Sequence, residues 1–83
     1  MSETFDLSEF YDDGDKCEDT FGDITSSTFE SYYKYVFSLK VTTDKGYEIL
    51  ADFGGDHDKI YRFDPSSPDW CEVLRVINVK KIE

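Results

Sequence analysis

Few residues of this chain carry groups for covalent catalysis, and they fall in no catalytic motif. His57 is the single histidine, and Cys17 and Cys71 are the two cysteines. A cysteine with a histidine base is the one constellation available for nucleophilic catalysis. His57, however, is flanked by Asp56 and Asp58, whose negative charges favour the protonated imidazole over the neutral base that catalysis needs. We therefore expect a surface histidine in a turn, and no enzymatic activity.

Two stretches contain the residue types that bind metal ions, but not the ligand spacing that a metal site requires. Asp56–Asp58 offers two carboxylates and an imidazole, but adjacent residues on a turn point apart and rarely bind one ion together. Asp12–Glu18 is similar in composition to a calcium loop. If Gly14 takes the glycine position of that loop, Tyr11 and Thr20 fall where oxygen ligands, including a bidentate glutamate, are required. We expect neither a metal nor a cofactor.

The charge of the chain is negative and unevenly distributed. The net charge is −10, from 19 acidic and 9 basic residues. Residues 1–30 contain ten acidic residues and one base, Lys16, whereas residues 31–83 contain nine acidic and eight basic residues. Self-repulsion of this size does not stabilise a fold, so the asymmetry points to solubility or to a binding partner.

The same charge argues against binding of anions by this chain. The glycines of Gly54-Gly55 are suited to a phosphate, but Asp52, Asp56 and Asp58 flank them and would repel it. At a sequence pI of about 4.3, direct nucleic-acid binding has to overcome repulsion from the phosphates. We expect the aromatic residues to build the core instead of stacking on bases.

The sheet that would position these residues centres on a β-hairpin from Phe29 to Phe53. Apolar side chains recur at every second position from Phe29 to Val41, broken by Ser31, which predicts one strand with an apolar face. Asp44-Lys45-Gly46 fits a three-residue turn with glycine in the left-handed position. This turn sets a register in which Val41 faces Ile49, Leu39 faces Ala51, Phe37 faces Phe53, and Thr43 faces Tyr47.

A short helix and a short strand are expected before the hairpin. Asp6 with Glu9 favours a helix over Leu7–Asp12, which Asp12-Asp13-Gly14-Asp15 ends. Thr20–Ile24 fits a short strand. Ser27–Glu30 also fits a capping box, but the alternating apolar row favours a strand from Phe29.

One more strand, a helical turn and a last strand are expected after the hairpin. Lys59–Asp64 alternates as a third antiparallel strand. Ser67 followed by Pro68 is a helix-start signal and predicts one turn over Pro68–Glu72. The β-branched residues that follow favour a last strand over about Val73–Ile82. The helical spacing of Trp70, Val73 and Leu74 leaves the alternative of a helix to Ile77.

These patterns predict one small α+β domain over residues 1–83, mostly β. We expect a twisted antiparallel sheet of three to five strands, built on a long hairpin, with one or two short helical segments. Residues 1–28 would form an acidic, partly helical segment packed on a sheet of residues 29–82.

The chain has no apolar run near about 18 residues and no basic-then-apolar N-terminus, so we expect no membrane span or signal peptide. The expected location is the cytoplasm, in the host cytosol for a phage-encoded protein, where Cys17 and Cys71 stay thiols.

The acidic residues of the N-terminal segment suggest a basic nucleic-acid-binding protein or nuclease complex as the partner. Carboxylates held along an ordered surface can occupy the sites of phosphates and gain charge-assisted hydrogen bonds to arginine. The chain would then inhibit an enzyme by mimicking DNA, with two aromatic residues as apolar anchors. The residues expected to contact the partner are Asp6, Glu9, Phe10, Tyr11, Asp12, Asp13, Asp15, Glu18, Asp19 and Asp23.

By size and charge the chain resembles a class of proteins, the phage-encoded inhibitors of host defence, which includes anti-CRISPR and anti-restriction proteins. It carries no motif of a particular family. In the same two respects it is similar to the immunity proteins that neutralise nuclease toxins, which is the alternative function. A further alternative is a plain protein-interaction module with a solvated acidic face, in which a peptide adds to an exposed strand edge. The sequence does not distinguish a monomer from a dimer.

Overall fold

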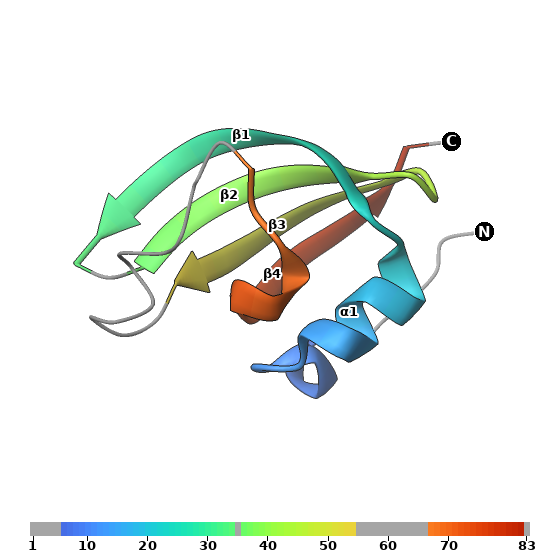
Figure 1. The fold of residues 1–83 in the computed structure, drawn as a ribbon, viewed down its shortest axis with the longest axis horizontal. Helices are drawn as coiled ribbons and strands as arrows, with labels where there is room; N and C mark the ends of the chain where they lie inside the picture. Colours follow the sequence, from blue (N-terminus) through green and yellow to red (C-terminus); the bar gives the residue numbers. More distant parts are fainter. Residues whose placement is uncertain (1–5, 35, 55–66, 83) are drawn as a thin grey trace.

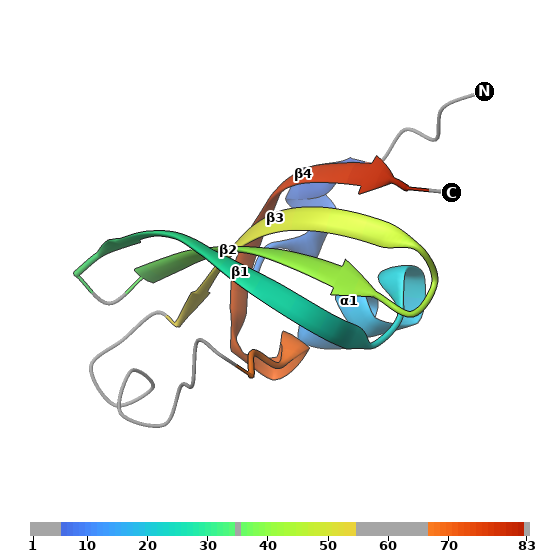
Figure 2. The same ribbon diagram turned by 90° about the horizontal axis from the view of Figure 1, so that it is seen from above.

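The computed structural model describes residues 6–34, 36–54 and 67–82, which form a four-stranded antiparallel sheet in the order β1-β2-β3-β4. Helical segments cover one face of the sheet (Figures 1 and 2). The α+β class, dominated by strands, is as the sequence predicted. The elements in chain order are η1 (Leu7–Phe10), α1 (Gly14–Phe21), β1 (Ile24–Tyr33), β2 (Val36–Thr43), β3 (Tyr47–Gly54), η2 (Trp70–Glu72) and β4 (Val73–Lys81), with η denoting a 3-10 helix.

The β2–β3 hairpin has the register that the sequence predicted. Val41 pairs with Ile49, Leu39 with Ala51, and Phe37 with Phe53. Gly46 has φ 86°, the left-handed conformation that the turn requires, and its N–H donates to the Thr43 carbonyl at 3.1 Å. The turn residues and the apolar alternation therefore predict the same register, because both depend only on residues close together in sequence.

The expected strand from Phe29 to Val41 is wrong, because the chain turns back on itself after β1. Tyr33 pairs with Val36 across the β1–β2 hairpin, and Lys34 has φ 56°. Paired residues share a face, so Tyr33 and Phe37, which a single strand would put together, lie on opposite faces of the sheet. The sheet also begins at Ile24, before the predicted boundary at residue 29. Alternation alone cannot distinguish one long strand from two strands joined by a tight turn.

The N-terminal segment contains a helix that the sequence did not predict. Asp6 caps η1 as expected, but Asp12-Asp13-Gly14-Asp15 starts α1 instead of ending the helical part. The Asp13 carboxylate accepts a hydrogen bond from the Lys16 N–H at 3.0 Å, which is the role of an N-cap residue. The strand expected at Thr20–Ile24 is wrong for the same reason, since α1 continues to Phe21.

The C-terminal elements follow the prediction. The turn η2 and the strand β4 correspond to the predicted turn and last strand, and the alternative of a helix to Ile77 is wrong. The N-cap is Asp69, whose carboxylate accepts from the Cys71 N–H at 3.1 Å, and not Ser67. The strand predicted over Lys59–Asp64 lies outside the described residues.

Aromatic side chains fill the core between the sheet and the helical segments. Phe21 lies 4.8 Å from Phe10, 5.4 Å from Tyr47 and 6.2 Å from Trp70, measured between ring centroids. The Trp70 indole N–H donates to the Gly22 carbonyl at 2.7 Å and so ties η2 to the end of α1. These contacts fix α1 on the sheet by apolar packing, which determines where its charged side chains point.

Candidate acidic interaction surface

The carboxylates predicted to contact a partner all lie on one ordered segment of the chain. The segment runs through η1 and α1 to the start of β1, along one face of the sheet (Figure 1). Each of these carboxylate residues is exposed. We call this set the acidic surface; its members are Asp6, Glu9, Asp12, Asp13, Asp15, Glu18, Asp19 and Asp23.

Helical periodicity separates the apolar and the acidic side chains of α1. Cys17 and Phe21 are fully buried and lie one turn apart on the inner side. Asp15, Glu18 and Asp19 have the i, i+3 and i+4 spacing that places them side by side on the outer side. The helix therefore presents three neighbouring carboxylates in a fixed arrangement.

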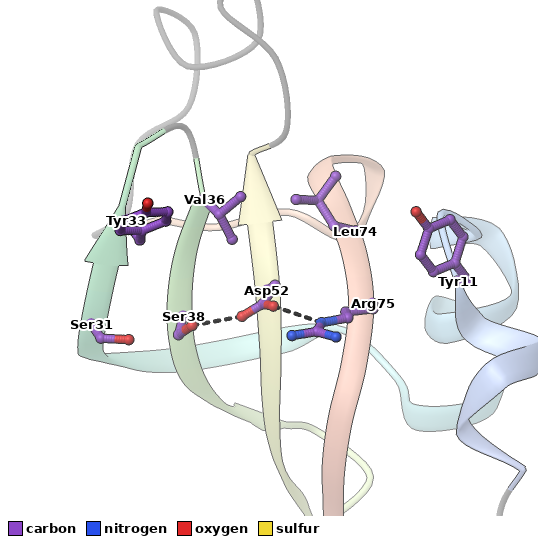
Figure 3. Close-up of a pocket in the computed structure, with 8 residues that line it drawn as sticks. All are labelled: Tyr11, Ser31, Tyr33, Val36, Ser38, Asp52, Leu74 and Arg75. Atoms are coloured by element: carbon purple, nitrogen blue, oxygen red, sulfur yellow. Dashed lines mark hydrogen bonds and ion pairs between the residues drawn. The ribbon is translucent and has the colours of Figure 1, made fainter.

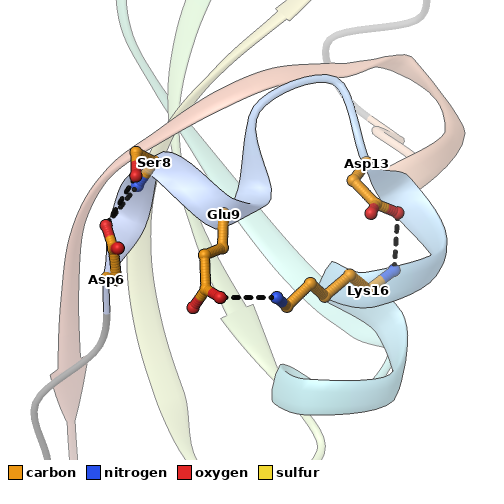
Figure 4. Close-up of polar contacts among 5 residues, drawn as sticks. All are labelled: Asp6, Ser8, Glu9, Asp13 and Lys16. Atoms are coloured by element: carbon orange, nitrogen blue, oxygen red, sulfur yellow. Dashed lines mark hydrogen bonds and ion pairs between the residues drawn. The ribbon is translucent and has the colours of Figure 1, made fainter.

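Three of the carboxylates have local contacts, which Figure 4 shows. Asp6 accepts hydrogen bonds from the Ser8 hydroxyl at 2.6 Å and the Ser8 N–H at 3.2 Å, and these bonds lower the pKa of Asp6. Asp13 caps α1, as described above. Glu9 forms an ion pair with Lys16 at 3.5 Å, between two exposed side chains. Such an exposed pair contributes little to stability, about 0 to 1 kcal/mol.

The other five carboxylates of the acidic surface have no cationic partner among the described residues. Lys45 contacts this part of the chain through the backbone, since its ammonium donates to the backbone carbonyl of Asp19 at 3.0 Å. That contact satisfies a carbonyl at the end of α1 and favours a cation at the negative end of the helix. It leaves the negative side chains of α1 available to a partner.

The two aromatic residues predicted to anchor a partner differ in their exposure. Tyr11 is 71% exposed and stands beside the acidic surface, whereas Phe10 is 2% exposed and packs on Phe21. The prediction that Phe10 anchors a partner is therefore wrong. Phe10 is the last residue of η1, whereas Tyr11 is its C-cap with extended backbone, so the two side chains leave the chain in different directions.

The cysteines do not form a reactive site with the groups that the structure describes. Cys17 is buried and Cys71 is exposed, and both are free thiols. Burial, reinforced by Asp13, raises the pKa of Cys17 to about 12, and partial burial with Asp69 and Glu72 raises the pKa of Cys71. Both shifts favour the thiol over the nucleophilic thiolate.

The remaining candidate metal and catalytic residues are placed as follows. His57 and the Asp56–Asp58 stretch lie outside the described residues. Asp12–Glu18 contains the cap and the first turns of α1, which is not the geometry of a calcium loop. Among residues 6–34, 36–54 and 67–82, no three carboxylate, imidazole or thiol groups come close enough to hold a metal ion.

The sequence interpretation assigned no role to a pair of charged residues in the sheet. Asp52 on β3 and Arg75 on β4 are neighbours in the register, and the Arg75 Nε donates to the Asp52 carboxylate at 2.8 Å. The signal in the sequence was Asp52, a carboxylate between the apolar residues Ala51 and Phe53 of β3. Such a residue is rarely buried unless it is paired.

Comparison of the chain with models of known protein families, with curated proteins and with solved structures gives no match. Within the described residues, the helices are too short and too polar to cross a membrane.

Proposed function

We propose that this protein is a small acidic inhibitor that binds a basic nucleic-acid-binding protein, such as a nuclease complex, and occupies its nucleic-acid site. One observation carries the proposal. Eight carboxylates are exposed on a folded segment, and in the described part of the chain only one of them, that of Glu9, has a cationic partner.

The chemistry of this inhibition is replacement of phosphates by carboxylates. An arginine that binds a phosphate with two parallel hydrogen bonds can bind a carboxylate in the same way. The side chains of Asp15, Glu18 and Asp19 are spaced by the helix before any partner arrives, which lowers the entropy lost on binding. The net charge of −10 also steers the protein toward a positively charged groove.

Tyr11 gives the acidic surface an apolar contact. Aromatic residues are enriched among the residues that dominate binding energy at interfaces. The backbone N–H of Asp12, the next residue, donates to the Leu74 carbonyl on β4 at 2.7 Å, which fixes this part of the segment to the sheet. Tyr11 is thus an exposed side chain on a backbone that is held in place.

Three alternative functions treat the acidic surface differently. An immunity protein would bind a single nuclease toxin and protect cells from it, which differs from the main proposal in target and not in mechanism. A solvated face that only keeps the domain soluble would bind no basic protein. A module that adds a peptide to a strand edge would be insensitive to the charge of α1.

The test compares two variants that bring the net charge from −10 to −6 in different places. Asp15→Lys with Asp19→Lys changes the outer side of α1. Ser26→Lys, Thr28→Lys and Glu30→Lys together change exposed positions of β1, and this triple variant is the control. Each protein is immobilised and exposed to a bacterial lysate at low salt and at about 1 M salt, where the Debye length falls to about 3 Å.

The proposal expects wild type and the β1 variant to capture the same nucleic-acid-binding protein at low salt. Duplex DNA and high salt should each displace that protein, and the α1 variant should capture at least about tenfold less of it, a loss near 1.4 kcal/mol. Circular dichroism checks that both variants fold. Equal capture by the two variants, or capture that DNA does not displace, would contradict the proposal.

A further inference from the structure

The face of the sheet opposite the helices contains a groove of about 600 Å³ (Figure 3). Because side chains alternate along β3, Ile49, Ala51 and Phe53 face the core, and Asp52 faces the other way. Ser31, Ser38, Asp52 and Arg75 form a row across the four strands at the floor of this groove. Tyr33 lines it over β1, and Tyr11 lines it beyond β4.

Asp52 positions Arg75 and is not itself available to a ligand. Its side chain is 8% exposed, and both carboxylate oxygens are occupied. The Ser38 hydroxyl donates to one oxygen at 2.6 Å, and the Arg75 Nε donates to the other at 2.8 Å. A carboxylate with both oxygens bonded and little exposure serves to orient its partner.

Arg75 retains the donors with which a guanidinium binds a carboxylate. Its side chain is 61% exposed, and its contact with Asp52 uses only Nε. Among the described residues no hydrogen bond or ion pair engages the two terminal nitrogens, which carry four N–H donors. Asp52 thus holds the guanidinium in one orientation, with a carboxylate-binding edge still free.

The shape of the groove favours an elongated ligand. Four strands spaced about 4.8 Å apart place the outer strands about 14 Å from each other, a length that an extended peptide spans with about four or five residues. The groove is open to solvent on one side, whereas sites for small molecules usually enclose about 70 to 90% of the ligand. It also extends to both sides of Arg75, so that a bound chain passes over the guanidinium.

The charge of the groove favours a single carboxylate on that ligand. Arg75 is the one basic residue among the described residues that line the groove, and Asp52 balances its charge. A nucleic-acid strand would bring several phosphates against one guanidinium and against the net charge of −10. A peptide with one acidic side chain supplies one carboxylate for the terminal nitrogens of Arg75.

We propose that this groove binds an extended peptide segment with one internal aspartate or glutamate between apolar residues. The carboxylate binds the terminal nitrogens of Arg75, and the hydroxyls of Ser31 and Ser38 line the path of the peptide backbone. One apolar neighbour of the acidic residue packs on Tyr11 beside β4, and on the other side the chain continues over Ser38 and Ser31 toward Tyr33 on β1. This binding differs from the proposed inhibition because it uses the sheet face that carries Asp52 and Arg75; the two surfaces share Tyr11 beside β4.

The experiment uses two blocked peptides that differ in one group, Leu-Glu-Leu and Leu-Gln-Leu, each extended by alanines to the length of the groove. They are titrated into the full-length labelled protein while the NMR signals of the Arg75 Nε–H and of the Ser38 and Asp52 amides are followed. Saturable shifts with the glutamate peptide are expected, with a dissociation constant on the order of 1 mM or tighter. The glutamine peptide should bind at least about tenfold more weakly.

Variants separate the roles of the groove residues. Arg75→Gln should lower affinity for the glutamate peptide to that of the glutamine peptide, and Asp52→Asn should weaken it because the guanidinium is no longer fixed. Lys80→Gln, on the same strand outside the groove, is the control and should change affinity less than about twofold. An unchanged amide spectrum away from the site shows that each variant is folded.

Three outcomes would overturn the proposal. The first is the absence of saturable shifts with either peptide. The second is equal affinity for the glutamate and glutamine peptides, which would show that no carboxylate is recognised. The third is inorganic phosphate binding to Arg75 as tightly as the glutamate peptide does, which would make the groove a general anion site.

Discussion

The carboxylates of the acidic surface and the carboxylate of Asp52 are the same chemical group in opposite environments. Asp15, Glu18 and Asp19 are exposed, crowd one another on a helix, and have no cationic partner among the described residues. Asp52 is 5% exposed, lies within a sheet, and receives hydrogen bonds from a serine and an arginine on the two neighbouring strands.

The difference teaches that environment, and not residue type, decides what a carboxylate does here. A carboxylate that loses water must be compensated within the fold, so Asp52 is committed to its neighbours and orients one of them. A carboxylate that keeps its water contributes little to the fold and stays available to a partner. The acidic surface is thus suited to recognition, and the Asp52–Arg75 pair to building a site.

The largest expected effect tests how much the apolar core contributes to holding the acidic segment in place. Phe21→Ala should lower the free energy of unfolding by about 3 to 5 kcal/mol, because a fully buried ring at the centre of the aromatic core is lost. Phe29→Ala is the matched control, since Phe29 is 55% exposed, and should cost less than about 1 kcal/mol. Urea denaturation measures both. A small loss for Phe21→Ala would mean that contacts other than the core fix the segment.

An intermediate effect distinguishes the two kinds of carboxylate directly. Asp52→Ala should lower the free energy of unfolding by about 1 to 2 kcal/mol. Ser38 loses its hydrogen-bond acceptor, and Arg75 loses its only ion pair in the described structure. Because Arg75 is exposed, water replaces part of that lost ion pair. Asp15→Ala should stay within about 0.5 kcal/mol of wild type. Thermal unfolding of the two variants, measured in parallel, compares their stabilities. Equal losses of stability would show that the two carboxylates contribute equally to the fold.

The smallest effect concerns repulsion within the acidic surface. Asp19 stands one turn after Asp15 and in the last turn of α1, where both the like charge and the helix dipole oppose a carboxylate. Asp19→Asn should therefore raise stability by a few tenths of a kcal/mol, or about 1 to 2 °C in Tm. The gain should disappear at about 1 M salt, where charges are screened. Glu30→Gln on β1 is the control, and a gain of the same size there would point to net charge instead of local repulsion.

Local signals in the sequence predicted much of the fold. Gly46 and the alternation around it fixed the β2–β3 register, and the β-branched residues after Glu72 identified β4. Asp6 as a cap identified η1. Each of these signals acts between residues close in sequence, so no information about the rest of the molecule was needed.

The sequence predictions were wrong where a stretch fits two local structures equally well. In those places a contact with a residue distant in sequence determines which structure forms. Asp12-Asp13-Gly14-Asp15 suits both a turn and a helix start. A side chain at Gly14 would collide with the backbone carbonyl of Trp70, so packing of η2 on the start of α1 requires a glycine there. The choice of Phe10 over Tyr11 for the core likewise depends on where Phe21 lies.

The sequence by itself determined that the chain is small, strongly acidic in its first third, and folded around a hairpin, because composition and turn chemistry are properties of the chain alone. Only the tertiary structure decided that α1 turns its carboxylates outward, that Tyr33 and Phe37 lie on opposite faces, and that Asp52 meets Arg75. Those outcomes depend on strand order and on packing between residues far apart in sequence, and burial exists only once the chain has folded.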